Sequence, residues 1–384
     1  MKRMSRNWRS LLNHRFGRRS AASVFAAAAL LCAAARGSAA AASPSATEGR
    51  EAPPQNESNP MKKPADEHSG QDGMIGKDMT KPFTTASTIG DLLAAPEFKG
   101  FAAYLLPLET LGGEARLSAA ERRMPLSSLA RLLPYHSHVD AERSCAILNR
   151  MRARAAAGEH IWIPLSRPGA GLFLFPAERS PGAAGAPRDP KAPFVLIAPG
   201  GGFVYVGSIH EGFPYAEAMN RNGMNAFVLQ YRVSGGARSA MEDMAEALVY
   251  IRKNAEALGV DPSGYAVMGS SAGARMVAWI GNLGVEPFGY EHAPKPAAVL
   301  MAYTGLSDAS ADDPPTFMVQ GTDDWIAPVR VVDRRMQALK ALGVPTDYMR
   351  VEGIGHGFGI GDGTPAAGWI DRAAKFWIAM RCCK

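Results

Sequence analysis

From residue 160 onward, short apolar runs alternate with longer stretches whose apolar residues recur at helical spacing. The runs HIWIPL and GLFLFP predict two paired strands. The later predicted strands are FVLIAPG, NAFVLQYRV, GYAVMGS, AAVLMAYTG, TFMVQGT and DYMRVEG, and the predicted helices lie near residues 209–222, 239–258, 272–282, 329–342 and 368–380. This repeated alternation predicts an α/β domain over residues 159–384, with a mostly parallel sheet covered by helices on both faces. Ligands bind at the carboxyl ends of such strands, so the loops that follow the strands are the candidate functional regions.

The region before this domain has a different texture. Residues 89–158 mix helical periodicity with proline-broken loops, which predicts an N-terminal extension of several short helices. This extension could form a cap over a site or simply brace the sheet. Residues 43–88 are rich in Pro, Ser, Glu, Asp and Lys and have few large apolar side chains, so we expect a disordered linker there.

The net charge of +6 is concentrated at the N-terminus. Residues 1–42 hold eight of the 42 Lys and Arg residues and none of the 36 acidic ones, so the remainder carries about −2 and gives no reason to expect a nucleic-acid partner. The basic start, the apolar run over residues 21–35 and the small residues after it predict a signal peptide and an exported, periplasmic or secreted protein. A retained N-terminal anchor is the alternative, but about 15 apolar residues are short for a membrane span. Beyond this leader we expect no membrane association, and the choice between the Sec and twin-arginine routes stays open.

Cysteine and metal-binding patterns are sparse. Without the leader the chain keeps Cys145, Cys382 and Cys383, an odd number that predicts no disulfide framework. A bond from Cys145 to one of the two C-terminal cysteines stays open. Neither C-x-x-C nor H-E-x-x-H occurs, so we predict no metal site and no cofactor.

The sequence GSSAG at residues 269–273 lies between a predicted strand and a predicted helix. It fits the pattern G-x-S-x-G only if Ser271 is the central serine and Ser270 is a spacer. The flanking small residues permit the sharp turn that exposes a nucleophilic serine above the sheet. The alternative is a plain glycine-rich start of a helix.

A neutral serine is a poor nucleophile and needs a base within hydrogen-bonding reach. His356, in GIGHGFG, is the one histidine that follows the last predicted strand, and its glycine neighbours allow the loop to turn inward. The other histidines lie in the leader, in the linker, before the alternating region or on predicted surfaces: His14, His68, His136, His138, His160, His210 and His292.

The acid that orients the base is expected in a loop after a strand between the serine and the histidine. TFMVQGTDDWIAP supplies Asp323 and Asp324 there, and spacing does not choose between them. Asp308, Asp312 and Asp313 in DASADDPP are interpreted as turn and capping residues.

Attack on a carbonyl also requires hydrogen-bond donors for the developing oxyanion. APGGGF at residues 198–203 closes the first central strand, and the amides of Gly201 and Gly202 there carry no Cβ that would block a substrate. The amide of Ala272 is a third candidate donor.

Residues near these loops have competing interpretations. Ser208 and Glu211 fit the S-x-x-E pattern of a capping box, so we interpret them as the start of a helix. Arg275 could bind a substrate carboxylate, although a salt bridge on the helix surface is the favoured interpretation. Three aromatic residues could shape a substrate pocket or simply pack: Tyr205, Tyr303 and Trp325.

Together these residues resemble the α/β-hydrolase superfamily over roughly residues 160–384. The closer likeness is to its esterase branch, which includes carbohydrate acetyl esterases and feruloyl-esterase-like proteins. The features that carry it are PGGGFVYVGSIHEGFPYAEAMNRNGMNAFVLQYRV, GSSAG, the G-x-x-D-x-x-x-P stretch from Gly321 to Pro328, and HGFGIGDGTPAAGW. The resemblance implies Ser271 as nucleophile, Asp324 as acid and His356 as base. It implies an oxyanion hole formed by the amides of Gly201, Gly202 and Ala272.

Two departures affect the substrate pocket more than the reaction. Related lipases usually have His before the glycines, where this chain has Pro199. Many relatives have Gly-His after the serine motif, where this chain has Ala274 and Arg275. The backbone amides survive both changes.

The sequence thus predicts a cofactor-free serine esterase that acts on short acyl or carbohydrate-linked esters through an acyl-enzyme intermediate. The partner would be a small-molecule or carbohydrate ester. A peptidase or amidase that uses the same triad is one alternative, and a non-catalytic binding protein on a hydrolase frame is another.

Overall fold

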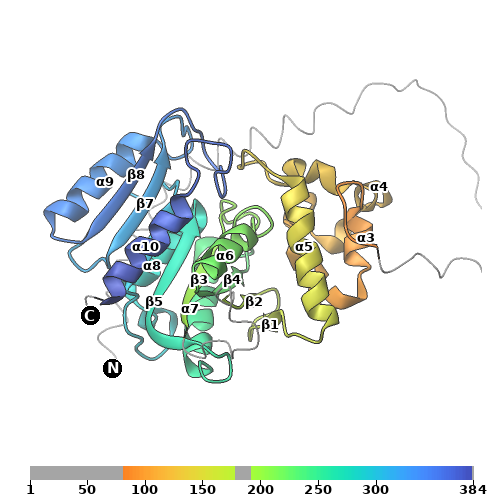
Figure 1. Ribbon diagram of the computed structural model, residues 1–384, viewed down its shortest axis with the longest axis horizontal. Coiled ribbons are helices and arrows are strands. Elements are labelled where there is room, and N and C mark those ends of the chain that lie inside the picture. Colours follow the sequence, from red (N-terminus) through yellow and green to blue (C-terminus); the bar gives the residue numbers. More distant parts are fainter. Residues whose placement is uncertain (1–80, 178–191, 383–384) are drawn as a thin grey trace, which may run out of the picture. The chain divides into compact units, whose positions relative to one another are not determined.

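The computed structural model describes residues 81–177 and 192–382 (Figure 1). The predicted signal peptide and the first part of the predicted linker lie outside the described residues. Lys81–Lys384 form one compact unit. No helix in the described part of the chain is both long and apolar enough to cross a membrane.

The linker boundary predicted at residue 88 is wrong. Phe83 is buried, its amide donates to Asn149 Oδ1 at 2.7 Å, and its carbonyl accepts from Asn149 Nδ2 at 2.8 Å. Thr88 caps α3 (Ile89–Leu93). Residues 81–88 therefore belong to the folded unit, because one aromatic side chain and one pair of hydrogen bonds anchor a polar segment that composition alone marks as disordered.

An eight-stranded sheet forms the centre of the unit, in the order β1-β2-β4-β3-β5-β6-β7-β8 (Figure 1). β1 and β2 are antiparallel to their neighbours, and the remaining pairs are parallel. The strands are β1 (Trp162–Pro164), β2 (Gly171–Phe175), β3 (Pro193–Ala198), β4 (Asn225–Gln230), β5 (Asp261–Ser270), β6 (Ala298–Ala302), β7 (Thr316–Gly321) and β8 (Thr346–Val351). The predicted mostly parallel sheet is confirmed.

Helices cover both faces because successive side chains of a strand point to opposite sides. Val195 and Ile197 of β3 enter one apolar core, whereas Leu196 enters the other. The first core receives α6 (Gly212–Arg221) and α10 (Trp369–Cys382). The second core receives α7 (Gly236–Lys253), α8 (Ala272–Leu283) and α9 (Val329–Ala341), and η6 (Glu286–Phe288) follows α8.

The N-terminal extension is helical, as the sequence predicts, but its last helix is not short: seven helices of seven residues or fewer precede one of 16 residues. They are α3 (Ile89–Leu93), η1 (Pro96–Phe98), η2 (Ala102–Leu105), η3 (Leu108–Leu111), η4 (Glu114–Arg116), α4 (Ala119–Arg122), η5 (Leu126–Leu132) and α5 (Ala141–Ala156). Capping boxes start α3 at Thr88 and α4 at Ser118. The buried side chains of the extension join the same apolar core as α6 and α10, which favours a bracing role. A separate contact between residues 135–138 and the candidate site is described below.

Candidate active site

Ser271 lies in a strained turn between β5 and α8. Its φ of 50° and ψ of −113° are unusual for a residue with a Cβ. The turn fits because the residues two positions before and after the serine are glycines: a Cβ on Gly273 would lie 1.9 Å from the carbonyl oxygen of Ala198, and one on Gly269 would lie 2.6 Å from Gly273. The helix can therefore start directly against β3, which exposes the serine at the carboxyl edge of the sheet.

The structure brings Ser271, His356 and Asp324 into one hydrogen-bonded chain. His356 Nε2 lies 2.9 Å from Ser271 Oγ, and His356 Nδ1 lies 2.7 Å from Asp324 Oδ2. His356 and Asp324 are buried, and Ser271 is partly exposed. This arrangement can carry a proton from the serine to the imidazole while the carboxylate holds the ring.

The two adjacent aspartates of the loop after β7 have different surroundings. Asp324 Oδ1 accepts hydrogen bonds from the amides of Ile326 at 2.9 Å and Ala327 at 2.7 Å, and Gln320 Nε2 donates to Asp324 Oδ2 at 2.9 Å. Asp323 is exposed and accepts from the hydroxyl of Thr322. Among the described residues, Asp324 is thus the aspartate placed against His356, a choice that spacing left open.

The glycine loop after β3 runs directly alongside the serine. A Cβ on Gly200 would lie 3.0 Å from Ser271 Cβ. Gly201 and Gly202 have φ angles of 133° and 65°, and a Cβ on Gly201 would lie 2.1 Å from the carbonyl oxygen of Tyr205. Only glycine fits this path, and Ala272 opens α8 on the other side of the serine.

The capping-box interpretation of Ser208 and Glu211 is wrong. The chain turns until residue 211 and α6 begins at Gly212, so Glu211 occupies the N-cap position and makes no capping bond through its side chain. Its carboxylate is buried, accepts hydrogen bonds from the Gly200 amide and the Tyr303 hydroxyl, and lies 2.9 Å from His136 Nε2. A spacing typical of a helix start therefore conceals a buried acid of the site.

Sequence reasoning also missed His136. It precedes the α/β domain along the chain, so its position gave no reason to connect it with the site. The available signal was the run YHSH at residues 135–138, which holds both histidines of residues 89–158.

The three aromatic candidates for the substrate pocket differ in their exposure to solvent. Tyr205 and Tyr303 are fully buried and hydrogen-bonded, so they pack beneath the site, whereas Trp325 is 66% exposed beside Asp324. The salt bridge favoured for Arg275 is not formed within the described ranges of the chain. Burial lowers the pKa of the Arg275 guanidinium, and the charge of Asp308 acts in the opposite direction.

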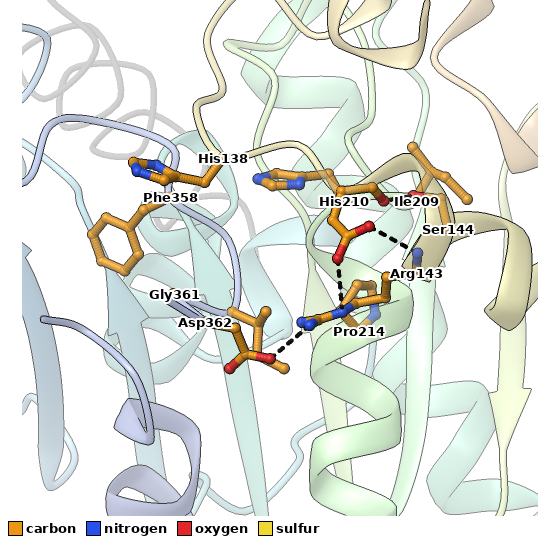
Figure 2. Close-up of a pocket in the computed structure, with 11 residues that line it drawn as sticks. His138, Arg143, Ser144, Ile209, His210, Pro214, Phe358, Gly361 and Asp362 are labelled. Atoms are coloured by element: carbon orange, nitrogen blue, oxygen red, sulfur yellow. Dashed lines mark hydrogen bonds and ion pairs between the residues drawn. The ribbon is translucent and has the colours of Figure 1, made fainter. Parts of the chain in front are cut away.

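A small cavity of about 40 Å³ lies where the extension meets the loop that follows His356 (Figure 2). His138 and Arg143 come from the extension, His210 precedes α6, and Asp362 belongs to the loop. Arg143 Nη2 lies 2.6 Å from Asp362 Oδ2, so an ion pair joins the two segments. The cavity has room for a few water molecules at most.

Within the described residues, neither a disulfide nor a metal-binding cluster forms part of the candidate site. Cys145 is buried and Cys382 is exposed, and both are free thiols, while Cys383 lies outside the described residues. No group of three or more His, Cys, Asp or Glu side chains within residues 81–177 and 192–382 is placed to hold a metal ion.

The strand order and the strained serine between β5 and α8, with its hydrogen-bonded partners, are those of the α/β-hydrolase fold. Residues 185–289 match the model of the BD-FAE family. The fold class and the esterase-branch resemblance predicted from the sequence are thereby confirmed.

Two curated proteins are similar to parts of the chain. An acetylxylan esterase of Xylanibacter ruminicola is 28% identical over 98 residues, which cover 25% of this chain and 20% of the relative. Endo-1,4-beta-xylanase B of Butyrivibrio fibrisolvens is 27% identical over 222 residues, which cover 47% of this chain and 35% of the relative. The chain thus spans about a fifth and about a third of the lengths of these curated relatives.

Two solved structures are also similar. MGS-M1, an α/β hydrolase enzyme from a Medee basin deep-sea metagenome library, is 22% identical with a TM-score of 0.49, covering 58% of this chain and 97% of that chain. The propionate-bound thermophilic esterase Est2 of Thermogutta terrifontis is 20% identical with a TM-score of 0.48, covering 55% of this chain and 89% of that chain.

Proposed function

We propose that the protein is an exported serine esterase that hydrolyses carboxylic esters through an acyl-enzyme intermediate. The observation that carries this proposal is the continuous chain from Ser271 Oγ through the His356 imidazole to the Asp324 carboxylate, with separations of 2.9 and 2.7 Å. Such a chain has no evident purpose in a protein that only binds.

The proposed reaction has two halves. His356 Nε2 takes the proton of Ser271 as Oγ attacks the ester carbonyl, and the protonated imidazole then gives that proton to the departing alcohol. The same imidazole then deprotonates a water molecule, which attacks the acyl-enzyme. As the bond between the acyl carbon and Ser271 Oγ breaks, the imidazolium returns that proton to Oγ and the acid is released. Asp324 keeps the imidazole oriented and stabilises its charged form.

Backbone amides would stabilise the oxyanion in both halves. Gly201 and Gly202 lie on the loop beside Ser271, and Ala272 begins the helix after it. One such donor is worth about 3 to 4 kcal/mol in the transition state.

For the substrate, we propose a short acyl group on a carbohydrate or a similar alcohol. The match to the BD-FAE family and the acetylxylan esterase relative support this class. Val204 and Trp325 are two of the four exposed large apolar side chains of the described residues, and they lie on the loops that carry Gly202 and Asp324. Apolar groups on both loops suit contact with a sugar ring or an aromatic acyl group.

Export is part of the proposal. The basic segment, the apolar run and the small residues of positions 1–42 form the pattern of a cleaved signal peptide. Expression of the full chain in a bacterial host, followed by fractionation and N-terminal sequencing, tests export and the cleavage position. Retention of uncleaved protein in the membrane fraction would favour the anchor alternative.

The activity is tested on the protein lacking residues 1–42 with a short-chain aryl acetate. We expect Ser271→Ala to lower kcat by at least about 10³-fold, because the nucleophile is lost. Ser263→Ala is the control, since it removes an exposed serine hydroxyl near the opposite end of β5. Mass spectrometry after treatment with a phosphonate ester should locate one adduct on Ser271. Equal rates in wild type and Ser271→Ala would end the proposal.

Substrate class requires a separate panel of acetylated xylo-oligosaccharides, feruloyl esters and aminoacyl amides. Faster turnover of the acetylated sugars supports the proposed class. Preferential turnover of the amides would favour the peptidase alternative. Tight binding of the sugars with no turnover would favour the binding-protein alternative.

A further inference from the structure

The segment that follows η5 in the extension contacts both loops of the proposed active site. His136 Nε2 lies 2.9 Å from the buried carboxylate of Glu211, on the side of the oxyanion loop. Ser137 Oγ donates to the carbonyl of His356 at 2.9 Å, and the Ser137 amide donates to the carbonyl of Gly357 at 3.0 Å. Two consecutive residues of the extension therefore bridge the loop of the base and the loop of the oxyanion donors.

Glu211 acts on the oxyanion loop through Gly200. Its carboxylate accepts the Gly200 amide, while the carbonyl of Gly200 accepts the amide of Gly207 at 2.9 Å. The carbonyl of Gly200 and the amide of Gly201 belong to the same planar trans peptide, so they point in opposite directions. Fixing the carbonyl of Gly200 thus fixes the direction in which Gly201 offers its proton.

The His136 ring packs against Gly207, which belongs to the segment that holds Gly200. A Cβ on Gly207 would lie 3.1 Å from His136 Nε2, so the imidazole contacts the residue whose amide holds Gly200. The other ring nitrogen, Nδ1, lies 3.0 Å from the hydroxyl of Tyr205. Because only 1% of the His136 side chain is exposed, the ring is held on both sides within the interior.

The Glu211 carboxylate is also linked to His356 through Tyr303. The Tyr303 hydroxyl donates to Glu211 at 2.8 Å, and the Tyr303 ring packs edge-on against the His356 ring with centroids 5.1 Å apart. Burial by itself raises the pKa of the Glu211 carboxyl, but the charge of His136 and the hydrogen-bonding groups of His136, Ser270 and Gly200 outweigh burial and lower that pKa to about 2. Glu211 is therefore a carboxylate acceptor at any pH at which the protein would work.

We propose that His136 and Glu211 are positioning residues that hold the oxyanion loop and the His356 loop in register, so that the extension completes the active site. The proposal rests on the proposed esterase function. It extends that function by assigning a catalytic consequence to His136, which lies outside the α/β domain, and to the buried carboxylate of Glu211 inside it. Neither residue touches the substrate, so their effect passes through the amide of Gly201 and the ring of His356.

The first test compares Glu211→Gln with Asp243→Asn in the protein lacking residues 1–42. Asp243 is a matched control: its carboxylate is also fully buried and charge-paired, with Arg232 at 2.8 Å, but it lies on α7 in the core on the other face of the sheet. Glutamine keeps the shape of Glu211 but presents an amide donor to groups that already donate. We expect Glu211→Gln to lower kcat about 10- to 100-fold with KM within about two-fold, because misplaced donors are felt in the transition state.

Asp243→Asn is expected to lower the Tm and leave kcat near wild type. A trifluoromethyl ketone, which forms an oxyanion adduct with the serine, separates the two roles further. For Glu211→Gln its affinity should fall by about the same factor as kcat, while KM for the ester stays constant. A merely structural role would lower the folded fraction, and with it the apparent kcat, but would leave KM and the inhibitor affinity unchanged.

A second pair of variants decides the question if Glu211→Gln does not fold. His136→Gln retains an N–H donor that can reach Glu211, whereas His136→Leu leaves the buried carboxylate without it. We expect His136→Gln to keep kcat within about five-fold of wild type and His136→Leu to lose at least ten-fold more, with folding checked by near-UV circular dichroism.

The outcomes are distinguishable from failure of the proposed function. If the wild type hydrolyses esters, but folded Glu211→Gln or His136→Leu retains wild-type kcat and inhibitor affinity, the positioning role is overturned and the esterase proposal stands. A parallel loss of Tm and activity in these variants and in Asp243→Asn also overturns it. If the wild type hydrolyses no ester, the proposed function fails and this inference fails with it.

Discussion

Replacing Asp324 by asparagine removes one negative charge from the centre of the site and preserves the shape of the side chain. Asp324 Oδ1 accepts two backbone amides, and Oδ2 accepts Gln320 Nε2 and faces His356 Nδ1 at 2.7 Å. Asparagine has a single side-chain oxygen, so it cannot accept both from the backbone amides on one side and from Gln320 and His356 on the other. If its oxygen keeps the backbone amides, its NH₂ group points at Gln320 and at His356, which favours the tautomer with hydrogen on the wrong ring nitrogen.

We expect Asp324→Asn to lower kcat by about 10⁴-fold, the magnitude typical of this change in serine hydrolases. That factor corresponds to about 5 kcal/mol of lost transition-state stabilisation. The assay is the hydrolysis of an aryl acetate under saturating substrate, with KM measured in parallel. KM should change little because the carboxylate does not touch the ester.

Asp323→Asn is the matched control, since Asp323 is exposed and accepts from Thr322 Oγ1 at 3.0 Å. We expect its kcat to stay within about three-fold of wild type. A larger loss in Asp323→Asn than in Asp324→Asn would move the orienting role by one residue and refute the reasoning from geometry. Equal and small losses in both variants would mean that no aspartate of this loop orients His356.

Three further predictions address the loops and the pH dependence of stability. Gly201→Ala should lower kcat at least about 100-fold, because its φ of 133° is strained for alanine and the new Cβ would lie 2.1 Å from a carbonyl oxygen; kinetics with circular dichroism check this. Burial and the nearby His136 charge lower the pKa of His210 from 6.5 to about 4. As the pH falls, His210 therefore binds a proton in the unfolded chain before it does so in the folded protein. This difference lowers the free energy of unfolding by about 3 kcal/mol between pH 6.5 and pH 4. Urea titrations at pH 7 and pH 4 should show a smaller loss for His210→Gln, and an equal loss would contradict the assignment. Trp325→Ala should change the free energy of unfolding by less than about 0.5 kcal/mol but raise KM for acetylated xylo-oligosaccharides several-fold, with KM for an aryl acetate unchanged.

The periodicity of the sequence was sufficient to predict the sheet. The runs that become β3, β5, β6 and β7 are apolar because both faces of these strands are covered, and the helices between them carry apolar residues on one side. The motif GSSAG could be placed for the same reason, because a strand before it and a helix after it are local signals. Positions such as Ser271 and His356 followed from the rule that parallel strands end at one edge of the sheet.

Local pattern failed where a residue's partner lies far along the chain. The S-x-x-E spacing at Ser208 and Glu211 is typical of a helix start, yet the backbone begins its helix three residues later than that motif requires. Spacing does not distinguish Asp323 from Asp324. The two residues differ because three amide groups, two of the backbone and one of a side chain, donate to the carboxylate of Asp324. The linker boundary was wrong for a related reason, since Asn149 anchors Phe83 from 66 residues away.

By itself the sequence determined which segments are strands and helices, where the strands end, and which residue types stand at those ends, because burial imprints a period of two or of 3.6 on the chain. Only the tertiary structure decided which of these groups meet. Ser271 and His356 are 85 residues apart. Glu211 contacts His136, which belongs to an extension that precedes the strands of the described residues. Distances of about 3 Å between such groups depend on how the extension and the sheet pack into one apolar core, and periodicity carries no information about that packing.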